Sequence, residues 1–77
     1  MSIRLYVTSA CTLCDEALDM LLESQPLAGK VLQVVDIAND DALLLRWSDK
    51  IPVLEIGGDQ LVWPFAVADV VQLLNRE

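Results

Sequence analysis

The alternation of strand-like and helix-like hydrophobic patterns is the feature that most constrains how this chain can fold. Residues 3–7 place apolar side chains at alternate positions, and from Thr12 to about Ser24 the apolar spacing becomes that of an amphipathic helix, which ends before Pro26. Further strands are expected at residues 31–36, 52–56 and 60–63, and further helices from the Asn39-Asp40-Asp41 cap to Trp47 and from Pro64 to Leu74. The sequence therefore predicts the element order β-α-β-α-β-β-α.

The connections between these segments indicate how the strands pair. Two strands joined by a helix are expected to be parallel, with a right-handed crossover. The second of them is mostly apolar, as a buried strand would be. Gly57-Gly58 is a tight hairpin signal, so the third and fourth strands are expected to be antiparallel. We therefore predict an α/β fold, one domain over residues 1–77, with a four-stranded mixed sheet flanked by three helices.

The charge of the chain excludes several classes of partner. Twelve acidic residues against five basic ones give a formal net charge of −7, and the bases are scattered, so no basic stripe could neutralise phosphates. No apolar run approaches the ~18 residues that span a bilayer, and no signal-like apolar stretch precedes the first strand. We expect a monomer in the cytoplasm that binds neither nucleic acid nor membrane.

Cys11-Thr12-Leu13-Cys14 is the motif to which a chemical mechanism can be attached. Residues three apart on a helix share a face, so the two sulfur atoms can meet. Cys11 falls at the start of the predicted helix, where unpaired amides and the helix dipole favour a nucleophilic thiolate. Cys14, one turn further on and expected to be more buried, would resolve a mixed disulfide formed by Cys11. Cytoplasmic thiols are kept reduced, so a purely structural disulfide is not expected.

Other interpretations of the two cysteines stay open at this point. Free cysteines often serve as small buried hydrophobic residues, and the spacing alone does not distinguish that role from redox chemistry. Their position directly after the first strand of a βαβ unit favours the redox pair. A structural zinc site needs four ligands, whereas the chain has two cysteines and no histidine. A metal or iron–sulfur centre would have to be shared between two chains, so no metal site is predicted.

The whole chain resembles the glutaredoxin branch of the thioredoxin fold. The first strand, the CxxC motif, the amphipathic helix and Ile51-Pro52-Val53-Leu54 before a hairpin are similar to the short bacterial glutaredoxin-like proteins. The resemblance implies that Pro52 follows a cis peptide bond and faces the cysteine pair, where the backbone of Ile51 would pair with a substrate cysteine. From the residues alone, an ordinary trans proline at the start of an edge strand is the alternative.

The sequence also departs from that family. Thr12 and Leu13 stand where the family usually has proline and tyrosine, so the resemblance implies that these two residues contact the substrate. It also implies an altered redox potential and the loss of an aromatic substrate contact. Residues 63–66 stand where glutaredoxins carry a Gly-Gly pair that binds glutathione, and Gly57-Gly58 belongs to the hairpin instead. Glutathione is therefore expected as a co-substrate at most, with no tightly bound cofactor.

The sequence favours a thiol–disulfide oxidoreductase that reduces protein or glutathione mixed disulfides through Cys11 and Cys14. The alternative is a non-catalytic binding or redox-sensing module of the same fold. Lys50, two residues before Pro52, is expected to lie near Cys11 and to stabilise a thiolate or a substrate carboxylate, although a solvated surface lysine fits equally well. Nearby acids, Asp15 and Glu16, oppose the thiolate but suit the first turn of the helix. The aromatic residues Tyr6, Trp47 and Trp63 are expected in the core, and the alternative for the two tryptophans is to line a substrate groove.

Overall fold

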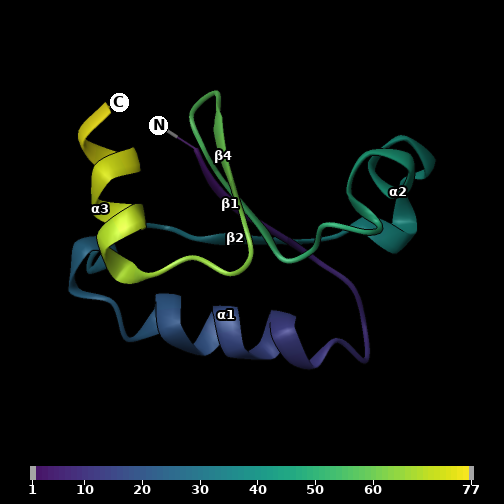
Figure 1. The fold of residues 1–77 in the computed structure, drawn as a ribbon, viewed down its shortest axis with the longest axis horizontal. Coiled ribbons are helices and arrows are strands. Elements are labelled where there is room, and N and C mark those ends of the chain that lie inside the picture. Colours follow the sequence, from purple (N-terminus) through teal and green to yellow (C-terminus); the bar gives the residue numbers. More distant parts are fainter. Residues whose placement is uncertain (1, 77) are drawn as a thin grey trace.

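The chain folds into a four-stranded mixed sheet with three α-helices, as the computed structural model of residues 2–76 shows (Figure 1). The elements are β1 (Ile3–Val7), α1 (Thr12–Leu22), η1 (Gln25–Leu27), β2 (Gln33–Asp36), η2 (Ile37–Asn39), α2 (Asp41–Trp47), β3 (Val53–Ile56), β4 (Asp59–Val62) and α3 (Val67–Arg76), where η marks a short 3₁₀ helix. The predicted element order and fold class are confirmed. The first and last residues of the predicted domain, 1 and 77, lie outside the described residues.

The strands lie in the order β2-β1-β3-β4. The parallel pairing of β1 with β2 and the antiparallel pairing of β3 with β4 are as predicted, and the structure adds that β1 and β3 are antiparallel. In the register, Val7 lies opposite Asp36, and Val53 lies opposite Tyr6 on one side and Val62 on the other. One end of the sheet therefore collects the last residues of β1, β2 and β4 and the first residue of β3. We call it the cysteine end, because only residues 8–11 separate β1 from α1 there.

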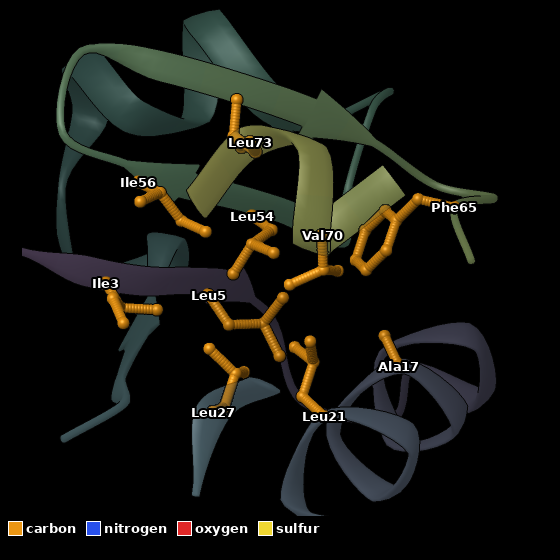
Figure 2. Packing of buried hydrophobic residues seen from close by; sticks show 10 residues of the cluster. All are labelled: Ile3, Leu5, Ala17, Leu21, Leu27, Leu54, Ile56, Phe65, Val70 and Leu73. Carbon is orange, nitrogen blue, oxygen red and sulfur yellow. The ribbon is translucent and has the colours of Figure 1, made fainter. Parts of the chain in front are cut away.

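The main core lies between one face of the sheet and the helices α1 and α3. Alternate residues of a strand point to opposite faces, so Leu5 and Leu54 face the helices. Ala17 and Leu21, four residues apart, face the sheet from α1. The buried residues of this cluster are Ile3, Leu5, Ala17, Leu21, Leu27, Leu54, Ile56, Phe65, Val70 and Leu73 (Figure 2). This core fixes the position of α1, and with it the cysteine pair, relative to the sheet.

A smaller core covers part of the opposite face of the sheet. Trp47 from α2 stacks on Tyr6 of β1 with ring centroids 6.1 Å apart, and Ile37 and Val53 complete the buried cluster. The predicted burial of Trp47 and Tyr6 is therefore confirmed. Trp63 is partly buried against the main core, where its ring meets Phe65 edge to face at 5.1 Å. All three aromatic residues thus have packing roles.

A polar row crosses the remainder of that face, with one residue from each strand: Gln33, Arg4, Glu55 and Gln60. Arg4 Nε donates a hydrogen bond to Gln33 Oε1 at 3.1 Å and lies 3.6 Å from the Glu55 carboxylate. Gln60 Nε2 donates to Glu55 Oε2 at 3.0 Å, and the Tyr6 hydroxyl donates to Glu55 Oε1 at 3.0 Å. Burial of the Tyr6 ring, followed by its hydrogen bond to Glu55, raises the pKa of Tyr6 above its ordinary value.

Several predicted element boundaries and one predicted burial differ from the structure; β3 and β4, for example, each begin one residue away from the predicted start. Helix α1 ends at Leu22, because the chain turns into the 3₁₀ helix η1 around Pro26. Strand β2 begins at Gln33 rather than at residue 31, and it is not buried, since the side chain of Val34 is 50% exposed. The reason is its position at the edge of the sheet, where α1 and α3 cover the central strands instead.

Pro64 does not open the last helix, contrary to the prediction. The Trp63 N–H donates a hydrogen bond to the Pro52 carbonyl at 3.1 Å. Trp63, the residue after β4, therefore still pairs with the residue before β3. The chain then crosses a cis Trp63–Pro64 bond in a loop, and α3 begins at Val67. The start of α3 is secured instead by Asp69, whose carboxylate accepts a hydrogen bond from the Ala66 N–H at 2.8 Å.

Asp40 caps helix α2, as predicted. Its carboxylate accepts hydrogen bonds from the N–H groups of Ala42 at 2.9 Å and Leu43 at 3.2 Å. We expect Asp40→Ala to lower the free energy of unfolding by about 1 kcal/mol in urea titrations. Asp49→Ala, which removes the same charge from an exposed residue, should change it by less than about 0.5 kcal/mol. Equal losses in the two variants would contradict a capping role.

Candidate active site

Cys11 is the N-cap residue of α1. Its backbone is extended, with φ −114° and ψ 103°, and its Sγ accepts a hydrogen bond from the Cys14 N–H at 3.1 Å. The Asp15 N–H donates to the Cys11 carbonyl at 3.1 Å, which closes the first turn. The sulfur thus occupies the place that a serine or aspartate oxygen usually takes at a helix N-terminus. Unpaired amides and the helix dipole at this position favour a negatively charged sulfur.

Cys11 and Cys14 form a disulfide with their Cα atoms 5.2 Å apart. The two residues differ in accessibility, since Cys14 is only 3% exposed and Cys11 lies partly open to solvent. Ala10, directly before the pair, has φ +54°, in the left-handed region that favours glycine. This turn redirects the chain from β1 into α1, and it leaves one sulfur near the surface and the other beneath it.

Ile51 and Pro52 lie at the cysteine end, directly before β3, and the peptide bond between them is cis, as the resemblance implies. The Pro52 side chain is fully buried, and Ile51 packs against the smaller core. The Ile51 N–H donates to the Trp47 carbonyl at 3.1 Å. A substrate backbone could therefore pair with the Ile51 carbonyl without breaking a hydrogen bond, but not with its N–H.

The other predicted site residues are exposed. Thr12 and Leu13 follow Cys11 in the first turn of α1, and the Leu13 side chain is 49% exposed. Lys50 lies at the cysteine end but pairs with Asp49, with 3.1 Å between Nζ and Oδ1. This hydrogen bond to the Lys50 ammonium lowers the pKa of Asp49 below its ordinary value. The ion pair partly neutralises the cation that we expected to act on a thiolate.

The comparisons with known proteins identify the family. The family described as Glutaredoxin-like domain (DUF836) matches residues 2–75. The chain belongs to this glutaredoxin-like family. An X-ray structure of the Northeast Structural Genomics target protein XcR50 from X. campestris is 32% identical, covers 99% of each chain and has a TM-score of 0.82. A solution structure of XcR50 is 29% identical, with the same TM-score of 0.82, and covers 100% of this chain and 96% of the other. None of the curated proteins matches.

As a glutaredoxin-like domain of the thioredoxin fold, the chain carries a CxxC redox module at the start of its first helix. Residues 2–76 hold no group of three or more histidine, cysteine or acidic side chains placed to bind a metal ion. Of the helices described, none is long and apolar enough to cross a membrane.

Among the contacts at the site of this glutaredoxin-like domain that the sequence interpretation missed is the hydrogen bond that the Trp63 N–H donates to the Pro52 carbonyl. It places the Trp63 backbone next to the proline at the cysteine end. Counting strand partners outward from the Gly57-Gly58 turn would have paired Val53 with Val62 and set Trp63 beside Pro52. The hairpin signal therefore contained this information.

Proposed function

We propose that this glutaredoxin-like domain is a thiol–disulfide oxidoreductase that reduces disulfides of proteins or mixed disulfides with glutathione. The observation that carries the proposal is the difference in accessibility between the two sulfurs at one helix N-terminus. Cys11 is partly open and lies where a thiolate is favoured, whereas Cys14 is buried one turn away. Exchange through a mixed disulfide needs such an attacking sulfur and such a resolving sulfur.

In the proposed reaction the reduced pair donates two electrons. The Cys11 thiolate attacks one sulfur of the substrate disulfide, a Cys11–substrate disulfide forms, and the other substrate sulfur leaves and takes a proton. Cys14 then loses its proton and attacks the Cys11 sulfur, which forms the Cys11–Cys14 disulfide and releases the second substrate thiol. In this proposal Thr12, Leu13 and the Ile51-Pro52 backbone contact the substrate, and no tightly bound cofactor takes part.

The proposal includes a cytoplasmic setting, where thiol donors keep such pairs reduced, and a monomeric chain. Glutathione could then serve as a donor of electrons without a dedicated binding site. A redox titration of the pair tests the proposal. The protein is equilibrated in glutathione buffers, the reaction is quenched with acid, and free thiols are alkylated and counted by mass.

We expect the pair to titrate as one two-electron couple with a potential between about −180 and −270 mV, the range of known oxidoreductases. A protein in which neither thiol reacts at neutral pH would contradict an oxidoreductase and favour a non-catalytic binding module. A pair that titrates reversibly but never exchanges with a protein disulfide would favour a redox sensor.

Lys50 is the cation that we propose to stabilise the Cys11 thiolate. Because Lys50 is exposed and paired with Asp49, its effect should be small. We expect Lys50→Ala to slow alkylation of the reduced protein at neutral pH by roughly twofold at low salt. Lys30→Ala, which removes the same charge from the residues following η1, is the control. Equal alkylation rates across pH in Lys50→Ala and the unmodified protein would exclude this role.

A further inference from the structure

The cysteine end of the sheet carries a strong excess of negative charge. Strands β1 and β2 end there, and α1 begins there. In the chain, α2 connects the end of β2 to the start of β3, so it also lies at this end, and the charged residues of these elements gather at one end of the molecule. In Figure 1, the loop that enters α1 and the helix α2 both lie on the right. Six carboxylates and two cations are placed there: Asp15, Glu16, Asp36, Asp40, Asp41 and Asp49 against Arg46 and Lys50.

Two of these carboxylates lie next to the disulfide. Asp15 stands one helical turn above Cys11, as its N–H bond to the Cys11 carbonyl shows, and Glu16 stands one turn above Thr12. Both are exposed, and neither forms an ion pair with another residue of the range 2–76. Their charges are therefore free to act on a molecule that approaches Cys11.

The two cations at this end do not balance the six carboxylates. Lys50 is paired with Asp49 at 3.1 Å, and the Arg46 guanidinium lies over the Trp47 ring, 4.7 Å from its centroid. Arg4 and Arg76 pair with Glu55 and Asp59. An anionic substrate would therefore meet a net excess of carboxylates at this end of the described chain, and no cation of residues 2–76 pairs with the two carboxylates next to Cys11.

We propose that the site selects cationic disulfides, those flanked by lysine or arginine in a protein or peptide, over glutathione disulfide. The inference rests on the proposed function and names the substrate class for it. Glutathione is anionic at neutral pH because it carries more carboxylates than ammonium groups. Fields of this kind change association rates by about tenfold or more and weaken as salt is added. Leu13, half-exposed between the cysteines, adds an apolar contact for the flanking side chain.

The test measures single-turnover reduction of two peptides by the protein, which is first reduced with dithiothreitol and then freed of it. Each peptide is closed by one disulfide, and the two differ only in flanking residues, lysine in one and glutamate in the other. The reaction consumes the protein dithiol and the peptide disulfide and yields the protein disulfide and the peptide dithiol. Because flanking charges alter the disulfide itself, each rate constant is divided by that for free dithiothreitol, which also attacks as a thiolate but has no carboxylates beside it.

We expect the normalised rate constant of the lysine peptide to exceed that of the glutamate peptide about tenfold at roughly 10 mM salt. The ratio should fall below about threefold at roughly 200 mM salt. Equal normalised rates, or a preference that salt leaves unchanged, would overturn the inference while the proposed function stands. Reduction of neither peptide would overturn both.

Charge variants identify the carboxylates responsible. Glu16→Gln should lower the preference about twofold at low salt, and Asp15→Asn with Glu16→Gln should lower it further. Glu23→Gln removes the same charge at the opposite end of α1 and should leave the preference unchanged. The glutamate peptide should react faster with the double variant than with the unmodified protein, a gain that a poorly folded variant would not show. Equal effects of Glu16→Gln and Glu23→Gln would contradict a local role.

Discussion

Replacing Cys11 with serine is expected to reduce disulfide exchange to the uncatalysed background. A serine hydroxyl is not ionised at neutral pH and cannot take the place of the attacking thiolate. The substitution should leave the fold intact, because serine is a preferred N-cap residue and its oxygen can accept the hydrogen bond that Cys11 Sγ now accepts from Cys14. The measurement is the rate of peptide disulfide reduction beside a circular dichroism spectrum.

Cys14→Ser is the matched variant, and its expected result differs. Attack by Cys11 should still occur, but the resulting mixed disulfide should persist, since the resolving sulfur is missing. Intact mass spectrometry would show the protein joined to one substrate molecule through Cys11. If Cys11→Ser forms the persistent adduct and Cys14→Ser does not, the two roles are exchanged. If both single variants retain full exchange activity, the pair does not act by this route.

The second large effect concerns stability. Leu54 is fully buried in β3, between its neighbours β1 and β4, where its side chain belongs to the main core (Figure 2). We expect Leu54→Ala to lower the free energy of unfolding by about 3 kcal/mol, from lost hydrophobic burial together with the cavity left behind. A domain of 77 residues has a total of only about 4–12 kcal/mol, so this variant should be marginally stable.

Leu45→Ala provides the control, because it removes the same atoms from a side chain that is 88% exposed. Urea titrations of the two variants should differ in midpoint, with Leu45→Ala within about 0.5 kcal/mol of the unmodified protein. Similar losses in both would indicate that Leu54 is not packed as described, or that the exposed face of α2 is covered in solution.

The sequence predicted most accurately the features that are determined by residues close together in the chain. The alternation in β1, the Asp40 cap and the Gly57-Gly58 turn each depend on neighbouring residues, and each is confirmed. Cys11 at the helix start belongs to the same group. The apolar repeat of α1 is confirmed for Ala17 and Leu21, which are buried, but not for Leu13, which is half-exposed. The cis bond before Pro52 was implied by the family resemblance, since the local sequence is compatible with both isomers.

The errors arose where the structure depends on contacts between segments that are distant in the sequence or on side-chain conformation. Val34 is apolar and β-branched, which suits a buried strand, but the sheet order leaves β2 at an edge. Pro64 suits a helix start, but the hydrogen bond from Trp63 to Pro52 holds the preceding residue in strand pairing. Lys50 was expected to act near Cys11, yet the structure pairs it with Asp49, and that pairing depends on side-chain conformations that no local pattern specifies.

The polar row across the sheet has a consequence for the folding of β3. Side chains on a strand alternate between faces, so a shift of its pairing by a single residue would exchange the two sets. Leu54 would then move to the face of the sheet that carries the polar row. Glu55 would enter the main core and lose its contacts with Arg4 and Gln60. Such a misaligned sheet would hold a buried, unpaired carboxylate, which is costly. The polar row thus favours a single register of the strands. Glu55 acts mainly by destabilising the shifted register, in which its carboxylate would be buried and unpaired.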